Sequence, residues 1–377
     1  MSLYFSQWVG QYWNQDVLVS SQNQWNSNVV RAAMAVDGGG YVNDSVSNYA
    51  KIKAVIEGAI NIGMYVIVDW HITSNLSYTP QAIQFFSNIS KTYGSYPHII
   101  YEIWNEPVVT WDVIVNYANQ VIPVIRANDP NNIIIVGTPD GSSGPWFPPS
   151  QRLNYNNVVY TLHIYEDVFG GVPQQQGRAQ ATTAMSNGIP IFVTEYGTGS
   201  VWPNETLEFG ETELWYEYFD QYFISHTNWC MSDVPGTMSA IKAGSTSYNT
   251  PAAQIGAIVA NSAYFTEDGI FVNQRYQNLD LTSPSAPHIV WSSQYWIGQT
   301  VDKTANPWNS TWQDGTATNY GNWNNPSQGP NNGNCTNQVC AIIMYSATST
   351  SANPGTWDAV AQISGYYPAI CQINAIY

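Results

Sequence analysis

Short apolar runs alternate with stretches of helical periodicity over about the first 265 residues of the chain. Eight runs have the β-branched and aromatic content of buried parallel strands: Ser2–Gln7, Val29–Val36, Tyr65–Asp69, His98–Trp104, Ile133–Val136, Val158–Ile164, Ile191–Thr194 and Ile224–Trp229. Helical spacing occupies the segments between them, most clearly Tyr49–Asn61, Pro80–Tyr93, Trp111–Arg126 and Leu207–Tyr222. Strands that alternate with helices predict an α/β fold with a parallel sheet, and eight strands predict a closed (β/α)8 (TIM) barrel.

The hydrophobic pattern and the composition of the sequence change after about Tyr264. Helical periodicity ends there, and Asn306–Asn334 is dense in Trp, Asn, Gly and Pro. Turn residues between short aromatic runs predict a loop-rich, mainly β module. We therefore expect two domains, a barrel over residues 1–265 and a smaller module over residues 266–377, with Asp280–Pro287 as a linker or an internal loop of that module.

Charge and composition narrow the class of partner. The chain has 10 basic and 26 acidic residues, a formal net charge of -16, which argues against binding to the phosphates of nucleic acid or of an anionic membrane. Trp, Tyr, Asn, Ser and Thr are abundant, while charged residues make up only 10% of the chain. Aromatic faces and uncharged hydrogen-bonding groups suit a neutral polyhydroxylated partner, although an acidic secreted protein of another kind has a similar composition.

The lack of a membrane-spanning stretch and the presence of glycosylation sequons bear on the location of the protein. No apolar stretch approaches the ~20 residues that span a bilayer, and Met1 leads directly into a strand-like run. We interpret the chain as a mature or trimmed form of a secreted protein. Asn-x-Ser/Thr sequons at Asn43, Asn75, Asn88, Asn204, Asn309 and Asn334 agree with that interpretation. We expect a monomer.

Two of the apolar runs end in a glutamate. One run continues into Asn105-Glu106-Pro107, and another continues into Glu195-Tyr196-Gly197. A carboxylate placed where a parallel strand stops lies at the C-terminal rim of the sheet, where α/β barrels carry their chemistry. Two carboxylates that face one cleft are the minimum apparatus for cutting a glycosidic bond. The sequence therefore predicts Glu106 and Glu195 as a catalytic pair.

The two glutamates need different surroundings. A general acid needs a raised pKa, which an apolar setting for Glu106 would supply. Glu195 must instead stay ionised to attack a sugar, and Arg31, which follows Val29-Val30 in an otherwise apolar run, is the candidate cation. The alternative for Arg31 is a buried ion pair that braces the barrel.

Further polar residues recur at strand ends. His71 closes one apolar run, and His163 and Tyr165 close another, so these side chains are expected at the same rim as the glutamates. His98 and His226 lie within or before strands and are interpreted as structural. No His-x-x-x-His or paired Cys spacing accompanies the strand-end residues, so we expect neither a metal nor another cofactor.

The barrel region resembles glycoside hydrolase family 5, and within it the endo-β-1,4-glucanases (cellulases). The segments that carry the resemblance are Ser2–Trp8, Trp25–Met34, Gly39–Tyr41, Tyr65–His71, Tyr101–Pro107, His163–Tyr165, Phe192–Gly197, Asn228–Trp229 and Ser232–Asp233. The resemblance implies that Glu106 is the acid/base and Glu195 the nucleophile. It also implies supporting roles: Asn105 binding the sugar 2-OH, Arg31 and Tyr165 orienting Glu195, His71 and His163 lining the cleft, and Trp229 and Trp8 as stacking platforms.

Two segments depart from the pattern of that family. A Lys usually follows the Ser-Asp pair, but here Ser232-Asp233 is followed by Val234-Pro235-Gly236. A Trp usually follows the equivalent of Gly137-Thr138, but here Pro139-Asp140 follows and Trp146 comes later. The first change affects a contact to a distal sugar, and the second affects the leaving-group side of the cleft.

The C-terminal module resembles a C-type lectin-like domain. The resemblance rests on Trp296-Ile297-Gly298, Trp312–Thr316, Asn319–Trp323, Pro330–Asn332, Cys340, Trp357-Asp358 and Cys371. Sugar-binding members chelate calcium through an acidic or amide residue beside a proline, whereas Gly329 precedes Pro330 here. A structural appendage is therefore as well supported as a calcium-dependent sugar binder. Cys335 and Cys340 can pair locally or with Cys371, and Cys230 in the barrel is expected to be a buried free thiol.

We therefore expect a retaining endo-β-1,4-glucanase that acts on β-glucan polysaccharide. A related β-mannanase or xyloglucanase is the nearest alternative, because loops rather than the glutamates decide between these substrates. A non-catalytic carbohydrate-binding protein is the alternative from another class, and it predicts the loss of a catalytic residue that this chain retains.

Overall fold

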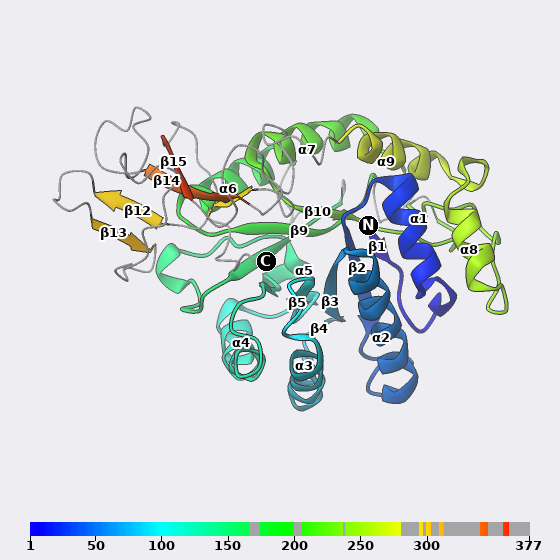
Figure 1. Ribbon diagram of the computed structural model, residues 1–377, viewed down its shortest axis with the longest axis horizontal. Helices are drawn as coiled ribbons and strands as arrows, with labels where there is room; N and C mark the ends of the chain where they lie inside the picture. Colours follow the sequence, from blue (N-terminus) through cyan, green and yellow to red (C-terminus); the bar gives the residue numbers. More distant parts are fainter. Residues whose placement is uncertain are drawn as a thin grey trace.

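A computed structural model describes residues 1–165, 174–199, 206–236 and 238–279 in full, together with the backbone of five short strands farther along the chain. Figure 1 shows strands at the centre of the first part, with helices arranged around them. Among these fully described residues, no helix is long and apolar enough to cross a lipid bilayer.

Eight parallel strands form the central sheet. In spatial order they are β1 (Ser2–Leu3), β2 (Val29–Ala35), β3 (Tyr65–His71), β5 (Ile99–Glu102), β7 (Ile134–Val136), β8 (Val158–Ile164), β9 (Ile191–Tyr196) and β10 (His226–Asn228). A parallel bridge between Leu3 and Met231, just after β10, brings the two ends of this order together. The prediction of a (β/α)8 barrel is confirmed, and each of the eight predicted runs contains or overlaps one strand.

Helices connect most consecutive strands. They are α1 (Gln15–Trp25), α2 (Ser45–Ile62), α3 (Thr79–Tyr93), α4 (Trp111–Arg126), α5 (Pro139–Ser142), α6 (Gln174–Ser186), α7 (Phe209–Tyr222), α8 (Ala252–Val259) and α9 (Glu267–Gln277), with short 3-10 turns at Gly10–Tyr12, Pro149–Gln151 and Ser262–Tyr264. Side-chain caps start several of them: Asn14 accepts a hydrogen bond from the main chain of Val17 at the start of α1. The four predicted helices are present, whereas α1, α5, α6, α8 and α9 were not predicted.

Helix α9 corrects the expectation that helical structure ends near Tyr264. Thr266 caps this helix, and its side chain accepts from the main-chain N–H of Gly269. The Asn26 side chain, at the end of α1, donates to the carbonyls of Tyr276 and Leu279, both at 2.9 Å. Because residues up to Leu279 pack on the barrel, we propose that the barrel domain extends at least that far.

The remaining described strands contribute only their backbone pairing. β11 (Gln294–Trp296), β14 (Cys340–Tyr345) and β15 (Trp357–Ala361) form an antiparallel sheet, and β12 (Gln299–Asp302) pairs antiparallel with β13 (Asn309–Trp312). Most of the residues that carry the lectin-like resemblance, along with Cys335, Cys371 and the Asp280–Pro287 segment, lie outside the described residues. The lectin-like domain and its ligand therefore stay predictions. Cys230 is a buried free thiol, as predicted.

Alternation along the strands builds the barrel interior in layers. Side chains at every second position of a strand share a face. An apolar layer packs inside the barrel: Val29, Ile67, Ile100, Ile133, Ile135, Val159 and Phe192. Two positions farther along β2, β3, β5 and β9 stand Arg31, Asp69, Glu102 and Thr194, all fully buried. This polar layer separates the apolar layer from the strand ends, where the candidate site lies.

Asp268 on α9 yields a stability prediction. Its side chain is fully buried; Thr198 donates to Oδ1, and Oδ2 has no hydrogen-bond partner among the described residues. Burial raises the pKa of Asp268 to about 7, and the Thr198 bond opposes this only in part. An acid with a raised pKa in the folded state contributes stability that is present below about pH 4 and lost as the pH rises through about 7.

We therefore expect Asp268→Asn to increase the free energy of unfolding at pH 8, by about 2–4 kcal/mol, because the amide cannot ionise. At pH 4 the same change gains nothing. Urea unfolding at the two pH values measures the difference, and Glu267→Gln, on the exposed neighbour, is the matched control. Equal effects of Asp268→Asn at both pH values would contradict this account.

Candidate active site

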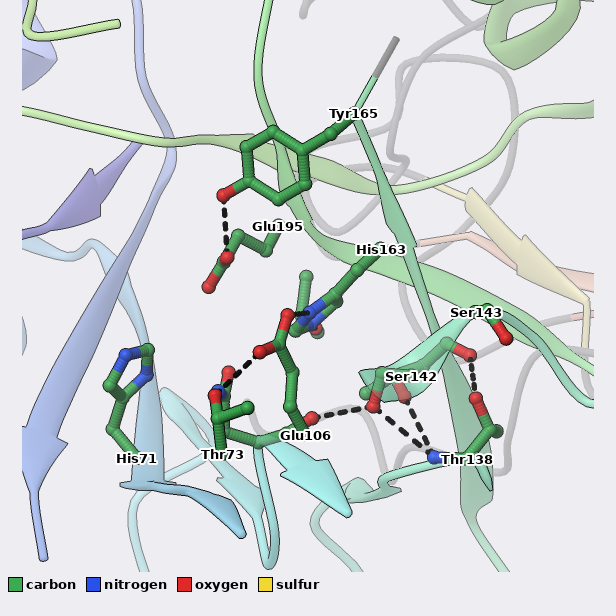
Figure 2. A network of polar contacts seen from close by, with 12 residues as sticks. His71, Thr73, Glu106, Thr138, Ser142, Ser143, His163, Tyr165 and Glu195 are labelled. Carbon is green, nitrogen blue, oxygen red and sulfur yellow. Dashed lines mark hydrogen bonds and ion pairs between the residues drawn. The ribbon is translucent and has the colours of Figure 1, made fainter. Parts of the chain in front are cut away.

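The predicted polar residues converge at the C-terminal ends of the strands. Arg31 comes from β2, His71 from β3 and His163 from β8, while Glu195 comes from β9. Glu106 lies in β6 (Glu106–Pro107), the short strand that follows β5 in the chain. β6 pairs with β4 (Thr73–Ser74). Figure 2 shows Glu106, His163, Tyr165 and Glu195 pointing toward one another, with His71 beside them.

Arg31 lies at the centre of a buried charge cluster. Its guanidinium contacts three carboxylates, Asp69 at 2.9 Å, Glu102 at 2.7 Å and Glu195 at 2.8 Å. It also donates to Oδ1 of Asn105 at 2.6 Å. Burial lowers the pKa of Arg31, but the three carboxylates outweigh it and raise that pKa well above its usual value. Arg31 thus both contacts Glu195 and braces the barrel, the two interpretations that the sequence left open.

Glu195 is held by one donor on each oxygen. The hydroxyl of Tyr165 donates to Oε1 at 2.6 Å, and Nη1 of Arg31 donates to Oε2 at 2.8 Å. The Glu195 side chain is 7% exposed, so it is almost completely buried. Two charge-assisted bonds of this length fix the orientation of the carboxylate.

Glu106 is more exposed than Glu195, with 19% of its side chain accessible. His163 Nδ1 lies 2.9 Å from Oε1, and the Thr73 hydroxyl donates to Oε2 at 2.5 Å. Burial raises the pKa of Glu106, but His163 and Thr73 stabilise the carboxylate and the net shift is downward. The expectation of an apolar setting with a raised pKa is therefore wrong for the protein without substrate.

His163 lies between Glu106 and the main charge cluster. Its Nε2 is 2.9 Å from the hydroxyl of Thr194 on β9. Burial lowers the pKa of His163, but Glu195, Glu102 and Glu106 outweigh it and raise that pKa to about 10. The imidazolium form is therefore favoured at neutral pH, and it supplies a proton beside Glu106.

The pKa of His71 is shifted in the opposite direction to that of His163. Its Nδ1 lies 2.7 Å from Asp69, and its ring stacks on Trp229 with centroids 5.3 Å apart. Burial, followed by the positive charge of Arg31, lowers the pKa of His71 to about 4, so the ring is neutral. Trp229 is 9% exposed in this packing, whereas Trp8 is 60% exposed and contacts Phe5 at a centroid distance of 4.8 Å.

One carboxylate oxygen of Glu106, one of Glu195 and one ring nitrogen of His163 all lie within 4.8 Å of one another. Such a grouping can in principle hold a metal ion. Here each nitrogen of His163 already has a hydrogen-bond partner, and all four carboxylate oxygens have partners too. The arrangement is therefore suited to proton transfer between His163 and Glu106. It also lets the carboxylates of Glu106 and Glu195 act on the same bond of a bound molecule.

The segment after Gly137-Thr138, one of the two that depart from the family pattern, hydrogen-bonds the main chain of Asn105. Ser142 has a left-handed backbone (φ 58°), and its hydroxyl donates to the main-chain carbonyl of Asn105 at 2.5 Å. The main-chain N–H of Thr138 donates to the same hydroxyl at 3.2 Å, as Figure 2 shows. In the other segment that departs from the family pattern, Ser232-Asp233, the Asp233 carboxylate accepts hydrogen bonds from the main-chain N–H and the hydroxyl of Thr246 at 2.6 and 3.0 Å.

Four members of the network were not predicted from the sequence: Asp69, Thr73, Glu102 and Thr194. Two of them carried a usable signal, because Asp69 and Glu102 are charges inside apolar runs and a buried charge requires a partner. They are direct neighbours in the register between β3 and β5. Thr73 and Thr194 carried none, since threonine is ordinary in and beside strands.

Comparison with known proteins gives a consistent result. A sequence model described as "Cellulase (glycosyl hydrolase family 5)" matches residues 1–234. An "Endoglucanase" of Clostridium saccharobutylicum is 37% identical over 313 residues, covering 81% of this chain and 67% of that protein. "Endoglucanase Z" of Dickeya dadantii is 40% identical over 238 residues, covering 62% and 55%. The chain thus spans about half to two thirds of the curated relatives it matches.

Solved structures agree in fold. A protein from Cytophaga hutchinsonii superposes with a TM-score of 0.68 at 38% identity, covering 74% of this chain and 87% of that one. The catalytic domain of the Thermobifida fusca endoglucanase Cel5A gives 0.66 at 27% identity, covering 74% and 90%. A variant of the latter domain was solved in complex with cellotetraose, at the same TM-score and identity.

Proposed function

The chain belongs to glycosyl hydrolase family 5, the cellulase family, and from this we propose that it is a retaining endo-β-1,4-glucanase. In this proposal Glu195 is the nucleophile and Glu106 is the acid/base. The observation that carries it is the approach of one oxygen of each glutamate to within 4.8 Å. Retaining enzymes hold their carboxyl groups about 5–5.5 Å apart, whereas inverting enzymes leave room for a water at about 6.5–9.5 Å.

The first step forms a glycosyl-enzyme. An oxygen of Glu195 attacks the anomeric carbon, the glycosidic bond breaks, and Glu106 gives a proton to the leaving oxygen. Arg31 and Tyr165 keep the attacking carboxylate in one orientation, which lowers the entropy that the step must lose. Asn105, fixed by Arg31, is proposed to bond the sugar 2-OH.

The second step hydrolyses that intermediate. Glu106, now a carboxylate, takes a proton from water; the resulting oxygen attacks the anomeric carbon and the bond to Glu195 breaks. Protons balance over the cycle, because Glu106 loses one to the leaving group and regains one from water. Two displacements at one carbon return the configuration of the substrate.

The substrate class is proposed from the relatives and from the aromatic residues. The relatives named above are endoglucanases, and one related domain was solved with cellotetraose. Trp8 presents an exposed ring, and Trp229 lies against His71 beside the charge cluster. Aromatic stacking contributes about 1 kcal/mol per contact. A polymeric glucan does not cross membranes, so we propose that the protein acts outside the cell. We further propose that it acts as a monomer.

Product stereochemistry tests this proposal. We expect proton NMR, recorded in the first minutes of cello-oligosaccharide hydrolysis, to show the β-anomer before mutarotation produces the α-anomer. Reducing ends should be released fastest from carboxymethylcellulose or mixed-linkage β-glucan. Fastest release from mannan or xyloglucan would favour the mannanase or xyloglucanase alternative. Binding without any release would favour the non-catalytic alternative, and an initial α-anomer would exclude a retaining mechanism.

A further inference from the structure

We propose that Thr194 and Glu102 are positioning residues that fix a proton on Nε2 of His163, so that Nδ1 of His163 and Glu106 hold one further proton between them. This inference rests on the proposed function, in which that shared proton is the one delivered to the leaving oxygen. Both side chains are fully buried, and in this inference they act through His163 rather than on the substrate.

Glu102 is the hydrogen-bond acceptor at the far end of this chain of contacts. Both of its oxygens accept from Arg31, with Nε to Oε2 at 2.7 Å and Nη2 to Oε1 at 3.2 Å. The hydroxyl of Thr194 lies 2.8 Å from Oε1. Despite complete burial, Arg31 and His163 lower the pKa of Glu102 to about 2, so this carboxyl is an acceptor only.

A threonine hydroxyl has a single hydrogen. Because Glu102 is an acceptor only, that hydrogen is directed to Glu102. The hydroxyl oxygen is then an acceptor toward its other neighbour, Nε2 of His163, at 2.9 Å. Nε2 must therefore carry a hydrogen in either protonation state of the ring.

The tautomer determines what His163 offers Glu106. With Nε2 protonated, a neutral ring would present the Nδ1 lone pair to Oε1 of Glu106 at 2.9 Å. Two acceptors at that distance repel unless a proton lies between them, so the pair resists losing its last proton. The ionisable groups around the ring are Glu102 from β5, Glu106 from β6, Glu195 from β9, Asp69 from β3 and Arg31 from β2, and the carboxyl groups outnumber the cation.

The proton balance of the reaction follows from this arrangement. The pair Glu106–His163 enters with one shared proton and gives it to the glycosidic oxygen as that bond breaks. It regains one proton from water in the second step. Loss of the shared proton to solvent inactivates the acid, and this loss sets the basic limb of the pH profile.

Thr194→Val tests the inference while keeping a β-branched side chain in β9. Without the hydroxyl, Nε2 has no acceptor at hydrogen-bond distance, because Oε1 of Glu102 lies 3.8 Å away. A neutral ring can then place its hydrogen on Nδ1, bonded to ionised Glu106. The deprotonated pair is thereby stabilised. We expect the basic limb of kcat/KM for an aryl β-cellobioside to move down by one pH unit or more, and Thr194→Ser to restore its wild-type position.

The matched control is Thr227→Val on the neighbouring strand β10. Its hydroxyl donates to the main-chain carbonyl of Thr194 and, among the contacts described, does not touch His163. A loss of packing or of a strand hydroxyl alone would affect both valine variants alike, without a shift of the basic limb specific to Thr194→Val. An unshifted limb in a folded Thr194→Val variant overturns the proposal.

A second readout needs no substrate. The chain has five histidines, so nitrogen NMR of histidine-labelled full-length protein is tractable. We expect His163 in the wild type to keep Nε2 protonated at every pH at which the fold persists. An unprotonated Nε2 overturns the proposal even if Thr194→Val does not fold. A wild type that hydrolyses no glycan overturns the proposed function, while the NMR result still decides the tautomer.

Discussion

Glu195→Gln is expected to lower kcat on β-1,4-glucan by about 10⁴-fold or more, the scale seen when a covalent nucleophile is removed. An amide oxygen is a poor nucleophile and cannot form the glycosyl-enzyme that the mechanism requires. The shape of the side chain is preserved, so Arg31 can still donate to the remaining oxygen of residue 195. Initial rates of reducing-end release measure the effect.

Glu57→Gln is the matched control for that variant. Glu57 lies on α2, half exposed, in an ion pair with Lys53, so its replacement makes the same chemical change away from the site. It should retain the wild-type rate. Circular dichroism and thermal unfolding check that both variants fold. A folded Glu195→Gln enzyme with wild-type turnover would exclude Glu195 as the nucleophile.

Arg31→Met has the largest expected effect on stability. It leaves Asp69, Glu102 and Glu195 buried within one cluster without the cation that now contacts all three. Removing one partner of a buried charge cluster typically costs about 3–5 kcal/mol, because the remaining charges are both desolvated and mutually repulsive. Urea unfolding at pH 7 measures this loss, which should shrink in acid as the orphaned carboxylates take up protons.

Lys53→Met provides the comparison with an exposed pair. Lys53 and Glu57 lie at i and i+4 on α2, each about half exposed, and such pairs contribute about 0.3–0.5 kcal/mol. The two variants remove one positive charge each, so net charge is matched. A loss in Arg31→Met no greater than that in Lys53→Met would show that the cluster is not electrostatically coupled.

The barrel could be predicted because its strands are buried on both faces. Runs such as Val29–Val36 and Val158–Ile164 are mainly apolar on both faces, with Arg31 as the one charged residue of the first and Thr161 and His163 as the polar residues of the second. Their ends were less predictable. Only Ser2–Leu3 pairs within the predicted run Ser2–Gln7, since Phe5 accepts from the main chain of Trp8 and Val9 and so begins a turn.

Helices that depend on tertiary contacts were missed. Helix α1 mixes polar and β-branched residues, and it is stabilised by packing that the sequence does not display: Trp25 donates to the carbonyl of Val259 at 2.9 Å, and Ser20 donates to that of Gly256 at 2.8 Å. Helix α6 is rich in Gln and Thr, with little amphipathic pattern. Local propensity is a weak guide where neighbours supply the stability.

The electrostatic state of the site depends on the same kind of contact. Strand ends pointed to Glu106 and Glu195, but the downward shift in the pKa of Glu106 comes from His163 and Thr73, which lie on other strands. The charge on His163 depends in turn on Glu102 and Glu195. Residue spacing places these groups at one rim, and only their packed distances determine which of them hold protons.

Trapping of the glycosyl-enzyme tests the central claim most directly. With a dinitrophenyl 2-deoxy-2-fluoro-β-cellobioside, the glycosyl-enzyme forms rapidly and is hydrolysed slowly. The labelled protein can therefore be digested and the residue that carries the sugar identified by mass spectrometry. The account predicts one label per chain, on Glu195, and none in Glu195→Gln. A label on any other residue, or hydrolysis of natural substrate with inversion and no label at all, would contradict it.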